Sequence, residues 1–521
     1  MYVAFKDHRV GTCSLDDQET RTTIDTTAPG SKWLSGDIVN PTTGQVIERR
    51  FSRHRAIVGI VDFLNRTRCG FTSRGVPLYY FHPLDASYPT MVVASKIAPT
   101  TNQFAVVALE HWDDMWPRAG IHTLLGEVGD KRVEKRALLA KFASPKCVFG
   151  EVVLPDVSSI QAYDTVVNID PPGCEDVDDV FCWKRIDDGY EFAIAIADVA
   201  TWVGEKTDID ILAFQKGETV YLDGAVVEPM LPTELSTLRA SLRRDGIPRP
   251  VVGLVYTIRN DVVQSVEWRA MNVIVTAAHT YDSVYADTDI CRILCYCLSI
   301  ITGQELTTDS HKWVESAMIT YNTEAAKLLR KHNVGILRSH KGKSNTEWLA
   351  LADKTGCAEL AHMGTAKGTY VYATVEDTAH NGLCIPLYCH ASSPLRRYAD
   401  LVNQRYMKYI LTGKHEPVAI PLPSHLNARS RIIKSLERDM WFLRNLNTDA
   451  ITEQTGFLIQ FKETRNAWTV YVPVWRRTVK AKYNGTDELV SGMSVTVQAY
   501  TNLAAVSWSN RIVCTIASRQ Q

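Results

Sequence analysis

The chain has 521 residues, of which 45% are hydrophobic and 22% are charged, and its formal net charge at pH 7 is -1. This composition is that of an ordinary globular protein long enough for about three or four domains, and it argues against a disordered chain. The near-zero charge excludes a globally basic nucleic-acid binder, so any such surface has to be a local patch. No run of residues has the apolar length of a membrane span, and the first residues lack the layout of a secretory signal.

The first elements in chain order are short β-type runs that follow a segment, residues 1–52, with little periodicity. Their spacing predicts a small antiparallel barrel over residues 53–125 and a linker over residues 126–160. Arginine and aromatic residues alternate through the barrel, which is typical of a platform for single-stranded nucleic acid. Packing of the barrel core explains the same aromatic residues equally well.

A stretch of ten residues, 170–179, comes next and carries most of the chemical information: Asp-Pro-Pro-Gly-Cys-Glu-Asp-Val-Asp-Asp. It follows an apolar, strand-like run at 163–169. Four carboxylates this close together raise one another's pKa unless a cation neutralises them. Dense oxygen ligands suit Mg²⁺ or Mn²⁺ better than zinc. A solvated acidic loop is the alternative, but the apolar lead-in and the rigid turn favour a metal site.

The later elements alternate between β and α patterns. We predict a hairpin from strands 180–186 and 190–199, an amphipathic helix at 313–334, a helix that begins at Ser393-Pro394, and a helix near 428–446. β-type runs return after Thr455 and predict a second small barrel with a basic strip at residues 476–482.

The twelve cysteines include no pair at CxxC spacing, so neither a zinc ribbon nor a disulfide framework is indicated. Cys291, Cys295 and Cys297 lie in an apolar stretch, where buried thiols on a helix are favoured over a metal site. We therefore expect a reducing, intracellular compartment, the cytoplasm before the nucleus or an organelle.

Several motifs, taken in order, resemble the ribonuclease II (RNB) family of exoribonucleases. The acids match the family's Asp-x5-Asp-x-Asp-Asp pattern, and residues 392–400, Ser-Ser-Pro-Leu-Arg-Arg-Tyr-Ala-Asp, resemble its Thr-Ser-Pro-Ile-Arg-Arg-Tyr-x-Asp signature. Further matches in the family order are residues 194–199, 217–222, 228–236 and 241–242. The Asp-Pro-Pro-Gly-Cys segment is more similar to the eukaryotic exosome-type branch, without the N-terminal endonuclease domain of some exosome subunits.

The resemblance implies an α+β fold, in which a mixed α/β RNB catalytic domain is flanked by small β-barrel domains of the OB or cold-shock type. The implied domains are the barrel at 53–125, the linker at 126–160, the RNB catalytic domain at 161–453 and a C-terminal OB-like RNA-binding barrel at 454–521. Residues 1–52 are interpreted as an N-terminal segment, the remnant of a first cold-shock barrel.

The implied activity is 3′-to-5′ hydrolysis of single-stranded RNA to nucleoside 5′-monophosphates with Mg²⁺, for which Mn²⁺ is a substitute. The implied metal ligands are Asp170, Asp176, Asp178 and Asp179, and loss of Asp178 should damage the chemical step most. The implied catalytic residues are Asp178, Arg396 and Glu437, and the implied substrate-binding residues are Tyr221, Tyr281, Glu315 and Arg397.

The signature arginine Arg396 is expected in the first turn of its helix, where it would grip phosphate oxygens. A surface pair with Asp400 is the alternative, and Arg397 is the ambiguous neighbour. Glu315 matches an acid that contacts the terminal sugar, and a carboxylate that accepts from a 2′-OH would separate RNA from DNA.

Three departures from the family pattern bear on how RNA is held. The stretch between Tyr281 and Glu315 is much shorter than in the family, and the phenylalanine that clamps the terminal bases there has no evident counterpart. Gln404 and Ala195 stand where the family usually has histidine. The main alternative is an inactive RNB-fold protein that only binds RNA, and a role within an RNA-decay or RNA-processing assembly is compatible with either. The sequence predicts no oligomeric state.

Overall fold

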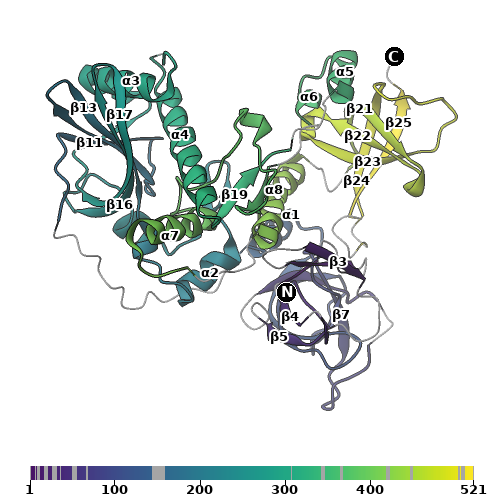
Figure 1. Ribbon diagram of the computed structural model, residues 1–521. Coiled ribbons are helices and arrows are strands. Elements are labelled where there is room, and N and C mark those ends of the chain that lie inside the picture. The colour runs from purple at the N-terminus through teal and green to yellow at the C-terminus, as the bar shows by residue number, and fades with distance from the viewer. Residues whose placement is uncertain are drawn as a thin grey trace. The chain divides into compact units, whose positions relative to one another are not determined.

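The chain forms two compact units, which are described separately. Unit 1 comprises residues Met1–Pro145, Gly342–Ala366 and Ser430–Gln521, and unit 2 comprises Lys146–Lys341 and Lys367–Arg429. The computed structural model (Figure 1) describes residues 2–5, 8, 12–16, 21–25, 32–35, 37–40, 42–49, 56–65, 69–142, 159–306, 308–341, 346–363, 368–417, 423–445, 450–502, 505 and 511–519.

Unit 1 begins with a five-stranded sheet in the order β3-β2-β1-β4-β5. Its strands are β1 Tyr2–Phe5, β2 Thr12–Asp16, β3 Arg21–Asp25, β4 Asp37–Val39 and β5 Val46–Arg49. Val3, Leu15 and Trp33 form part of a small apolar core on this sheet. The weak periodicity of residues 1–52 therefore concealed a sheet, and its interpretation as the remnant of a cold-shock barrel stays a prediction.

A closed barrel follows, in the order β10-β8-β7-β6-β9. Its strands are β6 Ile57–Val61, β7 Leu78–Pro83, β8 Met91–Ala94, β9 Gln103–His111 and β10 Arg118–Glu127. Alternate residues of these strands, such as Tyr79 and Phe81 of β7, fill its core, as the period of two requires. Helix α1, Lys131–Ala140, follows the barrel inside the predicted linker, with Asp130 accepting from the backbone N–H groups of Arg132 and Val133 at its N-terminus.

The end of unit 1 is a second closed barrel, in the order β21-β22-β23-β25-β24. Its strands are β21 Thr452–Lys462, β22 Ala467–Val472, β23 Arg477–Tyr483, β24 Ser494–Thr501 and β25 Ile512–Arg519. Helices α5, Thr346–Thr355, and α6, Glu359–Met363, share an apolar cluster with Tyr471 of this barrel. Both predicted small barrels are present, which confirms the expected fold class.

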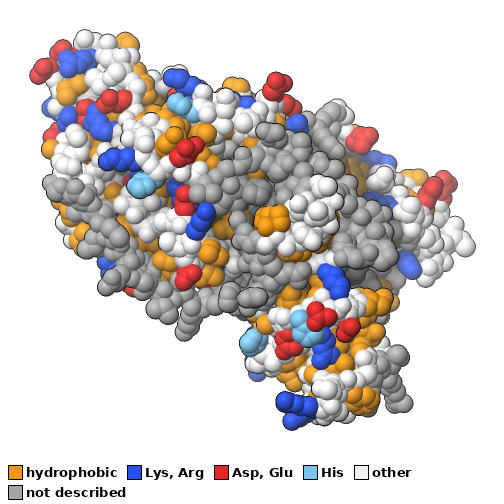
Figure 2. Space-filling model, turned by 60° about the horizontal axis from the view of Figure 1, so that its bottom comes forward, with side chains coloured by type: hydrophobic (Ala, Val, Ile, Leu, Met, Phe, Trp, Pro, Cys, Tyr) orange, Lys and Arg blue, Asp and Glu red, His pale blue; other side chains and the backbone are white. Residues whose placement is uncertain are grey.

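Basic and acidic side chains are interspersed on the face drawn in Figure 2, as the net charge of -1 suggests. The predicted basic strip on β23 is present only in part. Arg476, Lys480 and Lys482 are exposed, but the partly buried Arg477 pairs with Asp439 at 3.6 Å. None of the helices in the described ranges is long and apolar enough to cross a membrane.

Unit 2 is built on a six-stranded sheet in the order β17-β16-β13-β12-β11-β18. Its strands are β11 Thr165–Asp170, β12 Asp179–Ile186, β13 Gly189–Ala197, β16 Arg249–Arg259, β17 Val262–Val273 and β18 Ala277–Thr280. Its shorter elements are β14 Val220–Leu222, β15 Ala225–Glu228, β19 Ile336–Ser339, β20 Thr369–Tyr372 and the helical turns Val199–Thr201, Glu234–Arg239, Ser283–Ala286 and Asn381–Leu383. Its helices are α2 Asp208–Lys216, α3 Thr288–Thr302, α4 Ser310–Lys331, α7 Tyr398–Thr412 and the first part of α8 Pro423–Asn445.

The core of unit 2 lies between the sheet and helices α3 and α4, which cover one of its faces (Figure 1). Phe181 and Phe192 of the sheet, Leu294 of α3 and Trp313 and Tyr321 of α4 belong to this core. Burial of these apolar and aromatic side chains drives the sheet and the helices together. The predicted hairpin, the helix at 313–334 and the helix near 428–446 are confirmed with small changes of boundary.

Candidate active site

The aspartates gather where β11 and β12 meet at one end of the sheet. Asp170 is the last residue of β11 and Asp179 is the first residue of β12. Asp170 is opposite Thr280 of the parallel strand β18, and Asp179 is opposite Ile196 of β13. The sheet register therefore fixes both ends of the acidic stretch beside the central strands.

A tight turn and a buried serine shape the loop between these strands. Gly173 has φ of +79°, a conformation that suits glycine, and the Cys174 N–H donates to Pro171 O at 3.2 Å. The Ser241 Oγ accepts from the Val177 N–H at 3.0 Å and donates to Glu175 O at 2.7 Å. These bonds satisfy backbone groups of the loop and hold it in one shape.

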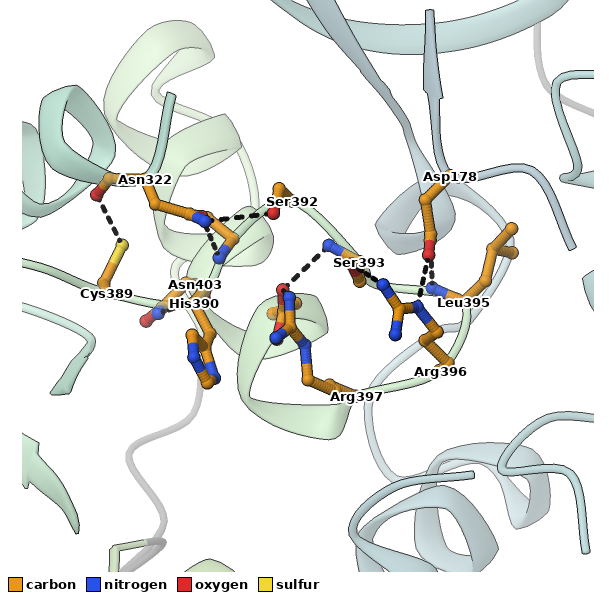
Figure 3. A network of polar contacts seen from close by, with 12 residues as sticks. Asp178, Asn322, Cys389, His390, Ser392, Ser393, Leu395, Arg396, Arg397 and Asn403 are labelled. Atoms are coloured by element: carbon orange, nitrogen blue, oxygen red, sulfur yellow. Dashed lines mark hydrogen bonds and ion pairs between the residues drawn. The ribbon is translucent and has the colours of Figure 1, made fainter. Parts of the chain in front are cut away.

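Asp178 is buried and joins the acidic loop to the signature segment (Figure 3). Its Oδ1 accepts from the Leu395 N–H at 3.0 Å, and its Oδ2 accepts from Arg396 Nε at 3.1 Å. The Arg396 Nη2 also donates to Ser393 Oγ at 3.0 Å. The alternative, a surface pair between Arg396 and Asp400, is therefore wrong: Arg396 makes a charge-assisted pair with Asp178, an acid 218 residues away.

The predicted start of the signature helix was wrong. Helix α7 begins at Tyr398, and Arg396 lies in the turn before it. The reason is tertiary, because the Thr219 N–H donates to Arg396 O at 2.8 Å and the Tyr398 N–H donates to Gly217 O at 2.9 Å. Pairing with this neighbouring segment holds Arg397 in an extended conformation, with φ of -134°, which a helix started at Ser393 would not allow.

Two buried polar residues brace the segment from behind (Figure 3). Asn322 of α4 donates to Ser392 Oγ at 3.0 Å and accepts from the Ala391 N–H at 2.8 Å. Asn403 of α7 donates to His390 O at 2.9 Å. The sequence offered one signal for Asn322, which is a polar residue on the otherwise apolar face of an amphipathic helix.

The acids carry more negative charge than their surroundings neutralise. Burial raises the pKa of Asp178 to about 7, although Arg396 and the Leu395 N–H oppose the shift. Burial raises the pKa of Asp170 to about 6, with the charge of Asp176 adding to it. Burial and the charges of Asp170 and Asp178 raise the pKa of Asp179 well above its ordinary value. A bound cation would relieve this repulsion.

The carboxylate oxygens of the four aspartates are ligands that a hard cation prefers, and one of these oxygens has no hydrogen-bond partner. The Asp170 Oδ2 is buried and has no hydrogen-bond partner. Asp176 accepts from Tyr221, and Asp178 is bonded as described. Within the described ranges, no group of three or more His, Cys, Asp or Glu side chains is arranged so that it could hold a metal ion.

Two predicted tyrosines lie beside the aspartates. The Tyr221 hydroxyl donates to Asp176 Oδ2 at 3.1 Å. Tyr281 follows directly after β18, and burial together with the charges of Asp179 and Asp170 raises its pKa to about 12. The Tyr281 ring also stacks on the ring of His311, with centroids 3.9 Å apart. The sequence did not identify His311 as a residue of the site.

The structure ties the remaining predicted site residues less directly to the aspartates. Arg397 pairs with the fully buried Asp400 at 2.9 Å, which gives it a bracing contact. Glu315 is exposed on α4 and pairs with Lys312 at 2.6 Å. Glu437 is exposed on the part of α8 that belongs to unit 1, so its role at the site stays a prediction.

The two histidine replacements sit in structural positions. Gln404 of α7 donates to Ala197 O at 2.7 Å and accepts from the Ala200 N–H at 3.0 Å. Ala195 is fully buried in β13. Gln404 thus satisfies backbone groups at the end of β13, which a histidine with one donor and one acceptor could also do.

Comparison with known proteins identifies two domains in the chain. Residues 159–289 and 298–413 match the RNB domain, and residues 78–143 match the Dis3-like cold-shock domain 2. The Caenorhabditis elegans protein named probable exosome complex exonuclease RRP44 is 27% identical, over 67% of this chain and 47% of that protein. Exoribonuclease 2 of Aeromonas hydrophila is 25% identical, over 55% of this chain and 54% of that protein. The chain spans about half the length of these relatives.

Solved structures share the fold. Mycoplasma genitalium RNase R, in complex with ribose methylated single-stranded RNA, aligns with a TM-score of 0.65 and 16% identity, over 99% of this chain and 100% of that one. Yeast Ssd1, described as a pseudonuclease, aligns with a TM-score of 0.64 and 12% identity, over 96% of this chain and 81% of that one. At this identity the likeness concerns the fold, which both an enzyme and a pseudonuclease adopt.

Proposed function

Since the chain carries an RNB domain and a Dis3-like cold-shock domain 2, we propose that it is a 3′-to-5′ exoribonuclease that hydrolyses single-stranded RNA to nucleoside 5′-monophosphates. The observation that carries the proposal is the contact between Asp178 and Arg396. It puts a cationic phosphate ligand directly beside the acidic loop. Relatives named as exonucleases of both the RRP44 and the exoribonuclease 2 type support it.

Arg396 is suited to hold the scissile phosphate. Its guanidinium uses Nε on Asp178 and one N–H of Nη2 on Ser393, and its side chain is 45% exposed. The remaining N–H groups point to a bidentate contact with phosphate oxygens. Because Asp178 and Ser393 fix the guanidinium beforehand, little ordering is needed when charge develops in the transition state.

Asp170, Asp176 and Asp179 would hold the Mg²⁺, for which Mn²⁺ is a substitute. When bound, the ion would supply charge neutralisation at the phosphate and acidify the attacking water. Asp178 would meanwhile orient Arg396 through one oxygen, since its own charge is shared with that guanidinium. Tyr221 would orient Asp176 through its hydroxyl.

Selection of RNA would rest on Glu315, whose exposed carboxylate can exchange Lys312 for a ribose 2′-OH. Glu437 is proposed as a further acid of the site. The two barrels would supply sequence-tolerant contacts to single-stranded RNA. A place in an RNA-decay assembly is proposed only because two relatives are named as exosome complex exonucleases.

Incubation with 5′-labelled and 3′-labelled RNA in Mg²⁺ tests the activity. We expect progressive shortening from the 3′ end and release of 5′-monophosphates. Asp178→Asn should abolish cleavage and keep RNA binding, whereas Asp187→Asn, at an exposed turn between β12 and β13, should change neither. Shortening from the 5′ end, or cleavage by Asp178→Asn at the wild-type rate, would contradict the proposal.

The second candidate is an RNA-binding protein with an inactive RNB fold, and one observation favours it. A pseudonuclease shares the fold over 96% of this chain. RNA binding by the wild-type protein without any shortening in Mg²⁺ or Mn²⁺ would establish this alternative.

A further inference from the structure

The start of helix α4 is fastened to the segment that carries Tyr281. Ser310, at 1% exposure, donates its hydroxyl to Tyr281 O at 2.7 Å, and its N–H donates to the Tyr285 hydroxyl at 2.8 Å. Tyr281 itself follows Thr280, the partner of Asp170 across β18 and β11. The first turn of α4 is therefore linked to Asp170 through the hydrogen bond from Ser310 to Tyr281 and the pairing of β18 with β11.

In this first turn, the ring of His311 stacks on the ring of Tyr281, and the two rings are nearly parallel. The ring centroids are 3.9 Å apart and the ring planes differ by 13°. The stack covers one face of each ring. His311 is exposed whereas Tyr281 is half-buried, so the outer face of the imidazole is the accessible end of the stack.

The helix period places His311 and Glu315 on the same side of α4, because residues four apart are neighbours on a helix surface. Trp313 and Ala317 point the other way and are fully buried in the core. An exposed aromatic face and an exposed carboxylate therefore adjoin each other beside the acidic loop. A terminal nucleotide carries the matching pair, a base and a 2′-hydroxyl group.

We infer that the His311–Tyr281 stack is the platform on which the base of the 3′-terminal nucleotide of bound RNA stacks. The inference rests on the proposed function and deepens it. Every base has a π-face, so such a contact is tolerant of sequence, and it strengthens binding about five- to 150-fold per base. The short segment between Tyr281 and Glu315 is consistent with a platform built from the first turn of α4 instead of a longer insertion.

RNA binding by proteins in an Asp178→Asn background, in Mg²⁺, tests the inference without cleavage. His311→Ala should raise the Kd about tenfold for RNA with an ordinary 3′-terminal nucleotide, and less than twofold for the same RNA with an abasic 3′-terminal nucleotide. His311→Phe should restore binding of the ordinary RNA, because it returns an aromatic face. His332→Ala, an exposed histidine at the other end of α4, should have no effect on either RNA.

Dependence on the terminal base separates stacking from a purely structural role of the stack. A stack that merely fastens α4 would give His311→Ala the same effect on both RNAs, and this result would overturn the inference, as would no effect on either. Failure of the proposed function has a different signature, since it is absence of RNA shortening by the wild-type protein while base-dependent binding persists.

Discussion

Asp179 has the least compensated charge among the residues of the acidic loop. Burial and two neighbouring carboxylates raise its pKa well above the ordinary value. Asp179→Asn removes that charge and should stabilise the protein in EDTA by about 1–2 kcal/mol, because a repelling buried carboxylate is unfavourable. Calorimetry should show a higher Tm in EDTA and a smaller rise of Tm on addition of Mg²⁺. Asp187→Asn should change neither, and a lower Tm for Asp179→Asn in EDTA would contradict the prediction.

The pH dependence of stability should reverse with Mg²⁺. The pKa values of Asp170 and Asp178 are raised in the folded protein to about 6 and about 7. A raised pKa means that the folded state binds the proton more tightly, so the contribution of this cluster to stability in EDTA is highest below about pH 4, the pKa of an unfolded Asp, and is lost as pH rises through 6 to 7. With saturating Mg²⁺ the ion needs ionised carboxylates, so stability should instead rise over that range. Parallel trends of Tm with and without Mg²⁺ between pH 5 and 8 would contradict the prediction.

At this scale the sequence could predict residues that are adjacent in the chain. The acids at 170–179 were visible because they form one motif, and their ligand roles stay predictions. The bond between Asp178 and Arg396 was not predictable, because it joins residues 218 positions apart. The stack of His311 on Tyr281 was hidden for the same reason, since it depends on how the start of α4 meets β18.

Helix α4 holds the signature segment through Asn322. The Asn322 side chain bonds Ser392, Tyr388 and the backbone of Ala391, all in the buried interior. Asn322→Ala leaves these groups without partners, and each buried unsatisfied group costs about 1–3 kcal/mol. We expect a loss of roughly 2–4 kcal/mol in the free energy of unfolding.

The same substitution should also lower kcat more than it raises KM, because the segment that it loosens leads to Arg396. Denaturant unfolding and steady-state cleavage of a short RNA measure the two effects. Lys327→Ala, on the exposed side of the same helix, should change neither by more than about 0.5 kcal/mol or twofold. A destabilised Asn322→Ala protein with unchanged kcat would limit Asn322 to a purely structural part.

Elements with strong periodicity were predictable, and elements set by distant partners were not. The apolar period of 3.6 identified α4 and α8, because the apolar face of each helix runs along its length. The start of α7 was misplaced, because Ser393-Pro394 has a local capping pattern that the bonds from Thr219 and to Gly217 override. A local preference for a helix start does not decide the structure when the backbone of that segment can pair with another segment in a sheet-like bridge.

At the scale of the molecule, the regular spacing of short β-type runs predicted both closed barrels, because a small barrel is built from short strands joined by turns. The five-stranded sheet at the N-terminus was not predicted, since its short strands show too little periodicity. The contact that joins the first and last segments of unit 1 was also not predictable from the sequence. It depends on Glu134 and Arg511, which are 377 residues apart.

Glu134 of α1 and Arg511, just before β25, form a buried bidentate ion pair, with 3% and 2% of their side chains exposed. The Arg511 guanidinium also lies 5.3 Å from the centre of the Phe104 ring on β9. Arg511→Met removes the cation and leaves the Glu134 carboxylate buried without its partner, which should cost about 3–5 kcal/mol. The loss should appear as faster hydrogen exchange in peptides of β9 and β25, with those of β13 and β16 in unit 2 unchanged.

The double variant Glu134→Leu/Arg511→Met decides whether the pair stabilises unit 1 or only avoids an isolated charge. Removing both charges also removes their desolvation, so the double variant should regain most of the stability lost by Arg511→Met. Arg132→Met, at an exposed arginine of the same helix, is the matched control and should stay within about 0.5 kcal/mol of the wild type. If the double variant is less stable than Arg511→Met, the pair itself contributes net stability, because the attraction between its two charges then outweighs their desolvation.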